Sequence, residues 1–136
     1  MASAFAAAHA ERVASVVGLS GQQPQNPPAA TIARSWQRCL RDFGLDPTRS
    51  RYPDVVAGAD LRALRERMGV VMEVAKTEIA NLYQQIAGTG YAVVFTDPKG
   101  VILEHLVDPS AGDLFERAGF VDGARWNEGS VGTNGM

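Results

Sequence analysis

Apolar positions in the first third of the chain recur at the spacing of helices. Residues 2–17 are rich in alanine and predict a weak helix that ends near Gly18. A better-specified helix is predicted over residues 30–43, because its larger apolar residues recur at helical spacing and share one face. These residues are Ile32, Trp36, Cys39, Leu40 and Phe43. Between the two helices, the glutamine- and proline-rich segment 21–28 predicts a flexible linker.

The longest apolar stripe predicts one continuous helix from Asp60 to Ala87, with the Asp60 carboxylate as its N-terminal cap. At the usual rise per residue, this helix would be about 42 Å long. Its apolar residues follow a heptad pattern with one stutter, which is typical of helix–helix interfaces. They are Leu61, Leu64, Met68, Val71, Ala75, Ile79, Leu82 and Ile86. The stripe therefore predicts a helical interface and a homodimer.

Two runs rich in apolar residues, at residues 91–96 and 101–107, predict the strands of a β-hairpin. The turn between them, Asp97–Gly100, combines proline, glycine and an aspartate that can bond turn amides. The first strand is apolar on both faces, as in the middle of a covered sheet. A lone hairpin is marginally stable, and only a short helix near residues 111–118 and a glycine-rich tail follow. We therefore expect an α+β fold whose sheet is incomplete, and the front part of a longer protein.

Composition narrows the class of protein. The chain is 46% apolar and 21% charged, so we expect neither a disordered nor a membrane-spanning protein. No basic residue precedes the N-terminal alanines, so we expect no secretory signal and a cytoplasmic location. The net charge of −2 combines a mildly basic head with an acidic tail. That distribution lacks the strongly basic domain typical of nucleic-acid binding.

Few residues offer catalytic or metal-binding chemistry. Cys39 is the single cysteine, which excludes an internal disulfide, and its place on an apolar helix face favours a buried structural thiol over a redox sensor. The two histidines, His9 and His105, lie far apart in the sequence, so no metal site is predicted. No pair of carboxylates and no Ser/His/Asp set occurs at a workable spacing. We therefore predict no catalytic residue, no cofactor and no enzyme activity.

The sequence leaves two interpretations open for His105 and two for a group of N-terminal arginines. His105 alternates with Leu103 and Val107 in the second strand, so it either contacts a ligand or is a core or surface histidine. Basic residues of the N-terminal part form either a solvated face or a phosphate-contacting, DNA-binding patch. They are Arg34, Arg38, Arg41, Arg49 and Arg51.

The tail, residues 123–136, is the most distinctive segment of the sequence. Its glycines could expose backbone amides to an anion, but it lacks the Lys-Ser/Thr ending of a phosphate-binding loop. The composition favours a structured turn instead. In that turn, we expect Trp126 to pack and Glu128 to accept hydrogen bonds from loop amides.

Four blocks of residues occur in the order found in a known family. They are Ile32-x-x-Ser35-Trp36-x-Arg38-Cys39, Gly44-Leu45-Asp46-Pro47, Thr96-Asp97-x-x-Gly100-x-Ile102-Leu103 and Trp126-x-Glu128-x-x-x-Gly132-Thr133-Asn134-Gly135. Over about residues 29–136, the chain resembles the N-terminal sensory region of bacterial sigma-54-dependent activators of the acetoin catabolism regulator type. Asn127 stands where that family often has serine.

The resemblance implies a GAF domain, in which an antiparallel sheet carries helices on its faces and in many members binds small effectors. It implies that the rest of the sheet, an ATPase module and a helix-turn-helix follow in a longer protein. Its last block makes Trp126, Glu128, Thr133 and Asn134 candidate ligand-binding residues, with structural packing as the alternative role. His105 joins these candidates from its place in the second strand.

Together, these features predict three segments. Residues 1–28 form a weak helix and linker, residues 29–58 a helical segment and loop, and residues 59–136 a signalling helix with the N-terminal part of a GAF domain. The predicted function is signal sensing, in which an unknown small effector shifts the long helix to control a downstream ATPase and DNA-binding module. DNA and sigma-54 RNA polymerase would be reached only through those downstream domains, with no membrane contact. The alternative is a helical homodimerisation module without ligand binding.

Overall fold

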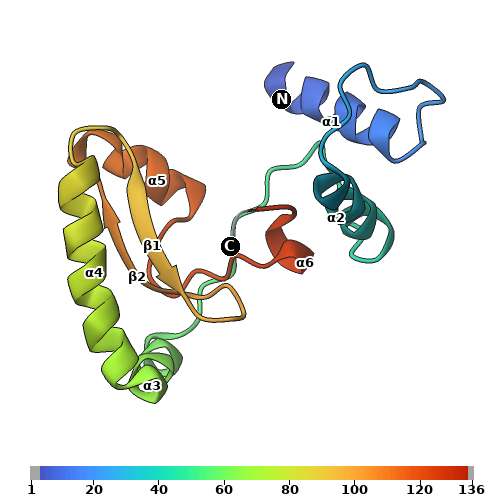
Figure 1. The fold of residues 1–136 in the computed structure, drawn as a ribbon. Coiled ribbons are helices and arrows are strands. Elements are labelled where there is room, and N and C mark those ends of the chain that lie inside the picture. Colours follow the sequence, from blue (N-terminus) through green and yellow to red (C-terminus); the bar gives the residue numbers. More distant parts are fainter. Residues whose placement is uncertain (1–3, 135–136) are drawn as a thin grey trace. The chain divides into compact units, whose positions relative to one another are not determined.

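The computed structural model describes residues 4–134, which form an α+β fold as predicted. Figure 1 shows the order of the elements along the chain. In the described part, the helices are α1 (Ala4–Val16), α2 (Ala30–Arg41), α3 (Gly58–Met68), α4 (Val70–Ile86), the 3₁₀-helix η1 (Pro109–Ala111), α5 (Gly112–Ala118) and α6 (Glu128–Val131). The strands β1 (Ala92–Thr96) and β2 (Ile102–Val107) form one antiparallel sheet.

The chain divides into two compact units. Within the described range, unit 1 contains residues 4–51 and the tail, residues 127–134, whereas unit 2 contains Tyr52–Trp126. The chain thus leaves unit 1, forms unit 2, and returns to unit 1 in its last residues. The functional segments predicted at residues 1–28, 29–58 and 59–136 stay a prediction.

Unit 1 is built from α1, α2 and α6. Both N-terminal helices were predicted and are confirmed, although residues 2 and 3 of the first prediction lie outside the described residues. The imidazole of His9 on α1 meets the Trp36 ring on α2 edge-on, with ring centroids 5.5 Å apart. Helix α2 ends at Arg41, two residues before the predicted end at Phe43. Gly44 follows with the expected positive φ, +62°, and the Leu45 amide turns back to donate to the Cys39 carbonyl at 2.8 Å.

The sheet of unit 2 confirms the predicted hairpin. Asp97 Oδ1 accepts hydrogen bonds from the amides of Lys99 and Val101, both at 2.9 Å, and Gly100 follows with a φ of +78°. The carboxylate thus satisfies amides inside the turn, which is the role expected of aspartate before Pro-x-Gly. All five residues of β1 are half-buried.

The single long helix predicted from Asp60 to Ala87 is wrong, because Gly69 interrupts it. Gly69 has φ +51° and ψ −125°, which ends α3 and begins α4. A residue with a Cβ rarely adopts such a conformation, so glycine is what makes the break possible here. Asp60 is not the N-terminal cap either. Helix α3 begins at Gly58 with Ala57 before it, and Asp60 lies within the first turn.

The core of unit 2 joins α3 and α4 to the hairpin. Met72, Val101 and Leu103 are buried at its centre, and α4 packs against both strands. Residues of the predicted apolar stripe divide between two environments. Leu61, Leu64 and Met68 pack on this core and Ile79 is buried, whereas Val71 and Leu82 are 54% and 49% exposed.

Helix α5 confirms the short helix predicted near residues 111–118, and the segment that follows it closes unit 2. It pairs on two sides, with an isolated bridge from Ala124 to Val55 and another from Arg125 to Val101. Trp126 packs against Phe120 at a centroid distance of 4.5 Å, and its indole N–H donates to the Gly119 carbonyl at 3.1 Å. The prediction that Trp126 packs in a structured turn is therefore confirmed.

Candidate functional site

The tail of the chain contains a helix that the sequence patterns did not predict. Asn127 has an extended backbone, and its Oδ1 accepts a hydrogen bond from the Ser130 amide at 2.9 Å, so it is the N-cap of α6. Serine is an equally good N-cap residue, so a serine at this position would cap α6 in the same way. The missed signal was this short polar residue followed by Glu128 in the first turn.

Helix α6 presents Glu128 to one face of α2. The carboxylate accepts two hydrogen bonds from the Arg38 guanidinium, Nε to Oε2 at 2.9 Å and a terminal nitrogen to Oε1 at 2.7 Å. It also accepts a hydrogen bond from the Ser35 hydroxyl. Because that hydroxyl has a single proton, the Thr133 hydroxyl is the donor in the 2.5 Å contact between Thr133 and Ser35.

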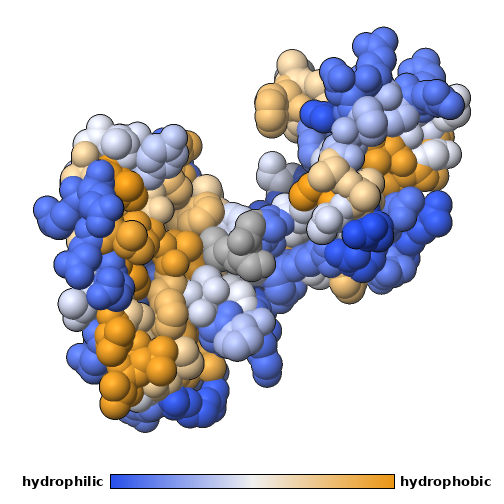
Figure 2. All heavy atoms as spheres, in the orientation of Figure 1, coloured by the Kyte–Doolittle hydropathy of each residue, from blue (hydrophilic) through white to orange (hydrophobic). Residues whose placement is uncertain are grey.

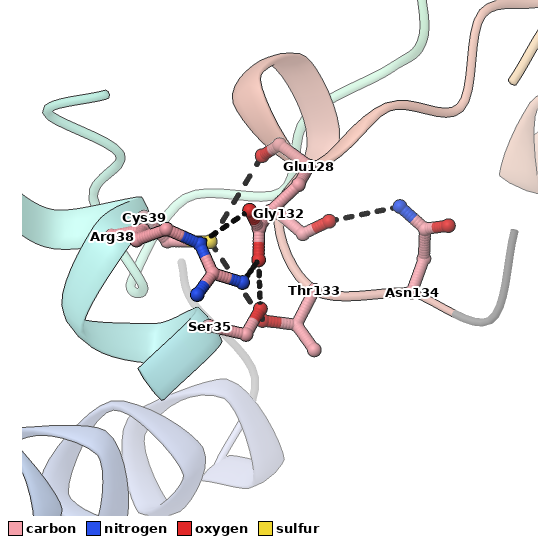
Figure 3. A network of polar contacts seen from close by, with 7 residues as sticks. All are labelled: Ser35, Arg38, Cys39, Glu128, Gly132, Thr133 and Asn134. Carbon is pink, nitrogen blue, oxygen red and sulfur yellow. Dashed lines mark hydrogen bonds and ion pairs between the residues drawn. The ribbon is translucent and has the colours of Figure 1, made fainter. Parts of the chain in front are cut away.

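We call Ser35, Arg38, Glu128 and Thr133 the polar clamp (Figure 3). Ser35 and Arg38 are three positions apart in α2, so both side chains emerge on the same face of that helix. The clamp joins this face to a tail about ninety residues further along the chain, since the Arg38–Glu128 separation is 90 positions. It therefore holds the tail in unit 1 by charge-assisted hydrogen bonds.

The hydrogen bonds of the polar clamp stabilise the charged forms of Glu128 and Arg38. The hydrogen bond from Arg38, followed by that from Ser35, lowers the pKa of Glu128 below its ordinary value. The hydrogen bond to Glu128 raises the pKa of Arg38 above its ordinary value. The prediction that Glu128 accepts hydrogen bonds from loop amides is wrong, because α2 occupies both carboxylate oxygens and Asn127 accepts from the loop instead.

The candidate ligand-binding residues lie in two different places. Glu128 and Thr133 belong to the polar clamp, and Asn134 lies beside it, with its side-chain amide donating to the Gly132 carbonyl at 2.9 Å. Cys39 is buried next to the clamp, its Sγ 3.7 Å from the Thr133 hydroxyl. Trp126 and His105 belong to unit 2.

His105 belongs to a second polar cluster, in unit 2. Its Nδ1 lies 2.6 Å from Asp122 Oδ1, and the other oxygen of Asp122 accepts from Arg65 at 2.7 Å. Arg65 Nε in turn donates to the Leu103 carbonyl at 2.8 Å. The sequence patterns pointed to His105 but not to its partners, because Arg65 on α3 and Asp122 in the closing segment are distant in sequence. The cluster ties these two segments to β2.

Unit 1 also contains a pocket of about 470 Å³ between α1, α2, the loop after α2 and the tail. Apolar side chains that include Val13, Trp36 and Leu45 line it, and Arg49 and Arg51 contribute charged groups. Thr133 belongs both to the pocket wall and to the polar clamp. The pocket and the clamp are thus adjacent parts of one site.

Residues 4–134 contain neither a cluster of metal ligands nor a membrane-spanning helix. Within that range, no three or more His, Cys, Asp or Glu side chains gather closely enough to hold a metal ion. None of the helices in the same range combines the length and apolar character that a membrane crossing needs.

No protein-family model matches the sequence. Individual proteins do match it. The chain is 35% identical over 104 residues to the acetoin catabolism regulatory protein of Cupriavidus necator, which is 76% of this chain and 16% of that protein. It is 30% identical over 105 residues to the acetoin dehydrogenase operon transcriptional activator AcoR of Bacillus subtilis, which is 77% of this chain and 17% of that protein.

A solved structure shares the fold. The N-terminal part of DhaR in the E. coli DhaR(N)-DhaL complex matches with a TM-score of 0.68 and 24% identity, over 75% of this chain and 34% of that one. The chain is thus similar, over about three quarters of its length, to part of proteins that regulate transcription. It spans about one sixth of the length of these two curated relatives.

Proposed function

We propose that this chain is the signal-sensing region of a bacterial transcriptional activator. The observation that carries the proposal is the 35% identity to a regulator of acetoin catabolism over 76% of the chain. The fold shared with DhaR(N) supports the same region of a regulator. The relatives are regulators rather than enzymes, which agrees with a site built from a clamp and a pocket.

In this proposal, unit 2 is the front part of a GAF domain whose sheet is completed by chain that follows. Its two-stranded sheet and the half-buried β1 support that idea, because such a strand gains stability from further covering. An effector bound by the complete domain then has different affinities for two arrangements of the helices, and so shifts the population between them. Helix α4 is the element that would transmit effector binding, because it packs against both strands.

In this mechanism, Gly69 is the hinge between α3 and α4. The backbone at Gly69 has a positive φ, so α3 and α4 are separate rigid pieces rather than one rod. A shift of α4 against the sheet would change the angle at this residue. The signal would pass from there to an ATPase and DNA-binding module, through which DNA and sigma-54 RNA polymerase are reached.

The direct test is an effector titration of the natural protein that contains this segment. Acetoin is the first compound to use, because the relatives regulate acetoin catabolism, and a panel of small carbon sources follows. Saturable binding in calorimetry together with effector-dependent transcription in a reporter strain supports the proposal. Transcription that ignores every compound of the panel would contradict it.

Homodimerisation without a ligand is the second candidate function. Four apolar residues of α4 are exposed, and Figure 2 shows apolar atoms over this part of the molecule. Val70, Val71 and Val74 are 79%, 54% and 57% exposed, and Leu82 is 49% exposed. A second copy that packs on this face would remove them from water.

Sedimentation of the chain tests this alternative. Val71→Asp with Val74→Asp should convert a dimer into a monomer, since each change buries a charge in the interface. Ile79 is unsuitable for the same test because it is buried within unit 2. Lys76→Gln, which changes an exposed charge on a different side of the same helix, is the matched control. A wild-type chain that stays monomeric at high concentration would exclude the alternative.

A further inference from the structure

The pocket of unit 1 has the size and lining of a small-molecule site. Its volume of about 470 Å³ lies in the usual range for ligand pockets, roughly 300–1,000 Å³. Val13, Cys39 and Leu45 line it although they are 4%, 8% and 8% exposed, so they form an apolar floor. Trp36 adds an aromatic wall. An apolar or aromatic body therefore fits this interior.

The charged groups of the pocket lining lie in the loop after α2. Two arginines, Arg49 and Arg51, line the pocket together with one acid, Asp46. The ion pair between Arg49 and Asp46 is long, at 3.3 Å, and the Arg49 side chain is 80% exposed. An exposed pair of this kind contributes little energy, so the Arg49 guanidinium is able to turn to a stronger partner. A carboxylate is that partner, because guanidinium binds it with two parallel hydrogen bonds.

We propose that this pocket binds a small amphipathic carboxylate. The apolar body contacts Trp36 and Leu45, and the carboxylate group binds Arg49 and Arg51. This site is separate from the effector site proposed for the complete GAF domain, since all its lining residues belong to unit 1. The inference therefore stands whether or not the GAF proposal does.

The occupant would also stabilise the polar clamp. Gly132 and Thr133 form part of the pocket wall, and Thr133 donates to Ser35 within the clamp. A bound carboxylate would contact this wall, and those contacts exist only while the tail is docked on α2. By linkage, binding then favours the docked tail.

Benzoate is the first probe, used with the 136-residue chain in an NMR titration. The chain has two tryptophans, Trp36 in the pocket and Trp126 in unit 2, so the two indole N–H signals report a test position and an internal control. Benzoate should shift the Trp36 signal in a saturable manner and leave the Trp126 signal in place. Benzyl alcohol, which lacks the charge, should bind at least tenfold more weakly. Amide exchange at Thr133 should slow at least twofold with benzoate.

Matched double variants test the charged end of the site. Arg49→Gln with Arg51→Gln should weaken benzoate binding at least fivefold, while Arg34→Gln with Arg41→Gln, which removes two arginines outside the pocket lining, should leave it unchanged. A dispersed amide spectrum shows that each variant is folded. Where a variant is unfolded, the wild-type chain in rising sodium chloride replaces it, and benzoate affinity should fall with salt.

Three results would overturn the proposal. They are a shift that stays linear up to high benzoate concentration, equal binding of benzoate and benzyl alcohol, and a benzoate affinity that neither the pocket arginines nor salt changes. Hexanoate and dodecanoate distinguish the source of the carboxylate. Tighter binding of hexanoate assigns the site to small metabolites, and tighter binding of dodecanoate assigns it to fatty acids.

Discussion

Unit 1 and unit 2 are held together by different kinds of contact. In unit 2, Val101, Ile102 and Leu103 are at most 2% exposed, and helices from earlier in the chain pack on this core. In unit 1, hydrogen bonds of Glu128 and Thr133 join the tail to α2, and the side chains of the Arg38–Glu128 pair are 46% and 29% exposed. Burial of apolar surface dominates the core of unit 2, whereas charge-assisted hydrogen bonds join the tail of unit 1 to α2.

The difference teaches how each unit should respond to its surroundings. Apolar burial depends little on pH and salt, because no charge takes part in it. A partly exposed ion pair is screened by salt and weakens when its carboxylate is protonated. We therefore expect the docked tail of unit 1 to respond more to pH and salt than the apolar core of unit 2 does.

The largest effect should come from the core of unit 2. Leu103→Ala removes a side chain that is 0% exposed, so the free energy of unfolding of unit 2 should fall by about 2–5 kcal/mol. Urea titration in a Trp36→Phe background measures it, because Trp126 then reports unit 2 alone. Leu114→Ala is the control, since Leu114 is 64% exposed. Equal losses for the two variants would contradict the core assignment.

A glycine in the closing segment should give the second-largest effect. Gly119 has a φ of +89°, and a Cβ there would lie 2.5 Å from Pro53 Cδ. Gly119→Ala should therefore lower the stability of unit 2 by roughly 1–3 kcal/mol through strain and overlap. Gly112→Ala is the matched control, because its φ of −51° suits alanine and no atom lies within 4 Å. A stability unchanged by Gly119→Ala would show that the segment is not packed as described.

Loss of the clamp charge should have a smaller effect, confined to unit 1. Glu128→Gln weakens the hydrogen bonds from Arg38 and Ser35, and after allowance for exposure the loss should be about 1 kcal/mol. Amide exchange at Val131 and Gly132 should become faster, whereas exchange in β2 should not change. Glu78→Gln, an exposed carboxylate on α4, is the control. Faster exchange in both units alike would contradict a clamp that acts on the tail alone.

The smallest effect should be a pH dependence of unit 1. The folded-state pKa of Glu128 lies below its ordinary value of 4.5, so its contribution is present above that value and is lost as pH falls through the lowered pKa. Wild type should thus lose more stability than Glu128→Gln as pH falls below 4.5. Acid titration of a Trp126→Phe background, in which Trp36 reports unit 1, measures the difference. Identical acid profiles for the two chains would contradict the charged clamp.

Unit 2 has its own acid-sensitive group, at lower pH. The Ser110 hydroxyl and amide lower the pKa of Asp108 from 3.8 to about 2. The contribution of Asp108 is therefore complete above pH 3.8 and is lost only as pH falls toward 2. Glu128 begins to lose its contribution at the higher pH, so the acid response of the two units should separate in that order.

The sequence predicted those parts of the fold that local chemistry determines. The hairpin follows from Asp97, Pro98 and Gly100, because each residue acts on its own turn. The break at Gly69 did not follow from the heptad count. A glycine inside a helix costs only about 1 kcal/mol relative to alanine, so periodicity alone does not distinguish a tolerated glycine from a helix end.

The candidate site was visible in sequence only as separate residues. The resemblance to a sensory region singled out Ser35 and Arg38 in one block and Glu128 and Thr133 in another. Their contact spans 90 or more positions, and no local pattern encodes a pairing at that distance. Helix α6, which presents Glu128, has four residues and is too short for any helical period to be recognised.

The division of unit 1 between the two ends of the sequence has a consequence for its synthesis. Protein chains emerge from the ribosome from the N-terminus onward, and compact parts fold as they appear. Helices α1 and α2 leave the ribosome first, yet Glu128 and Thr133 arrive only after all of unit 2. The polar clamp can therefore form only after all of unit 2 has been synthesised, and until then Ser35 and Arg38 lack their partners from the tail.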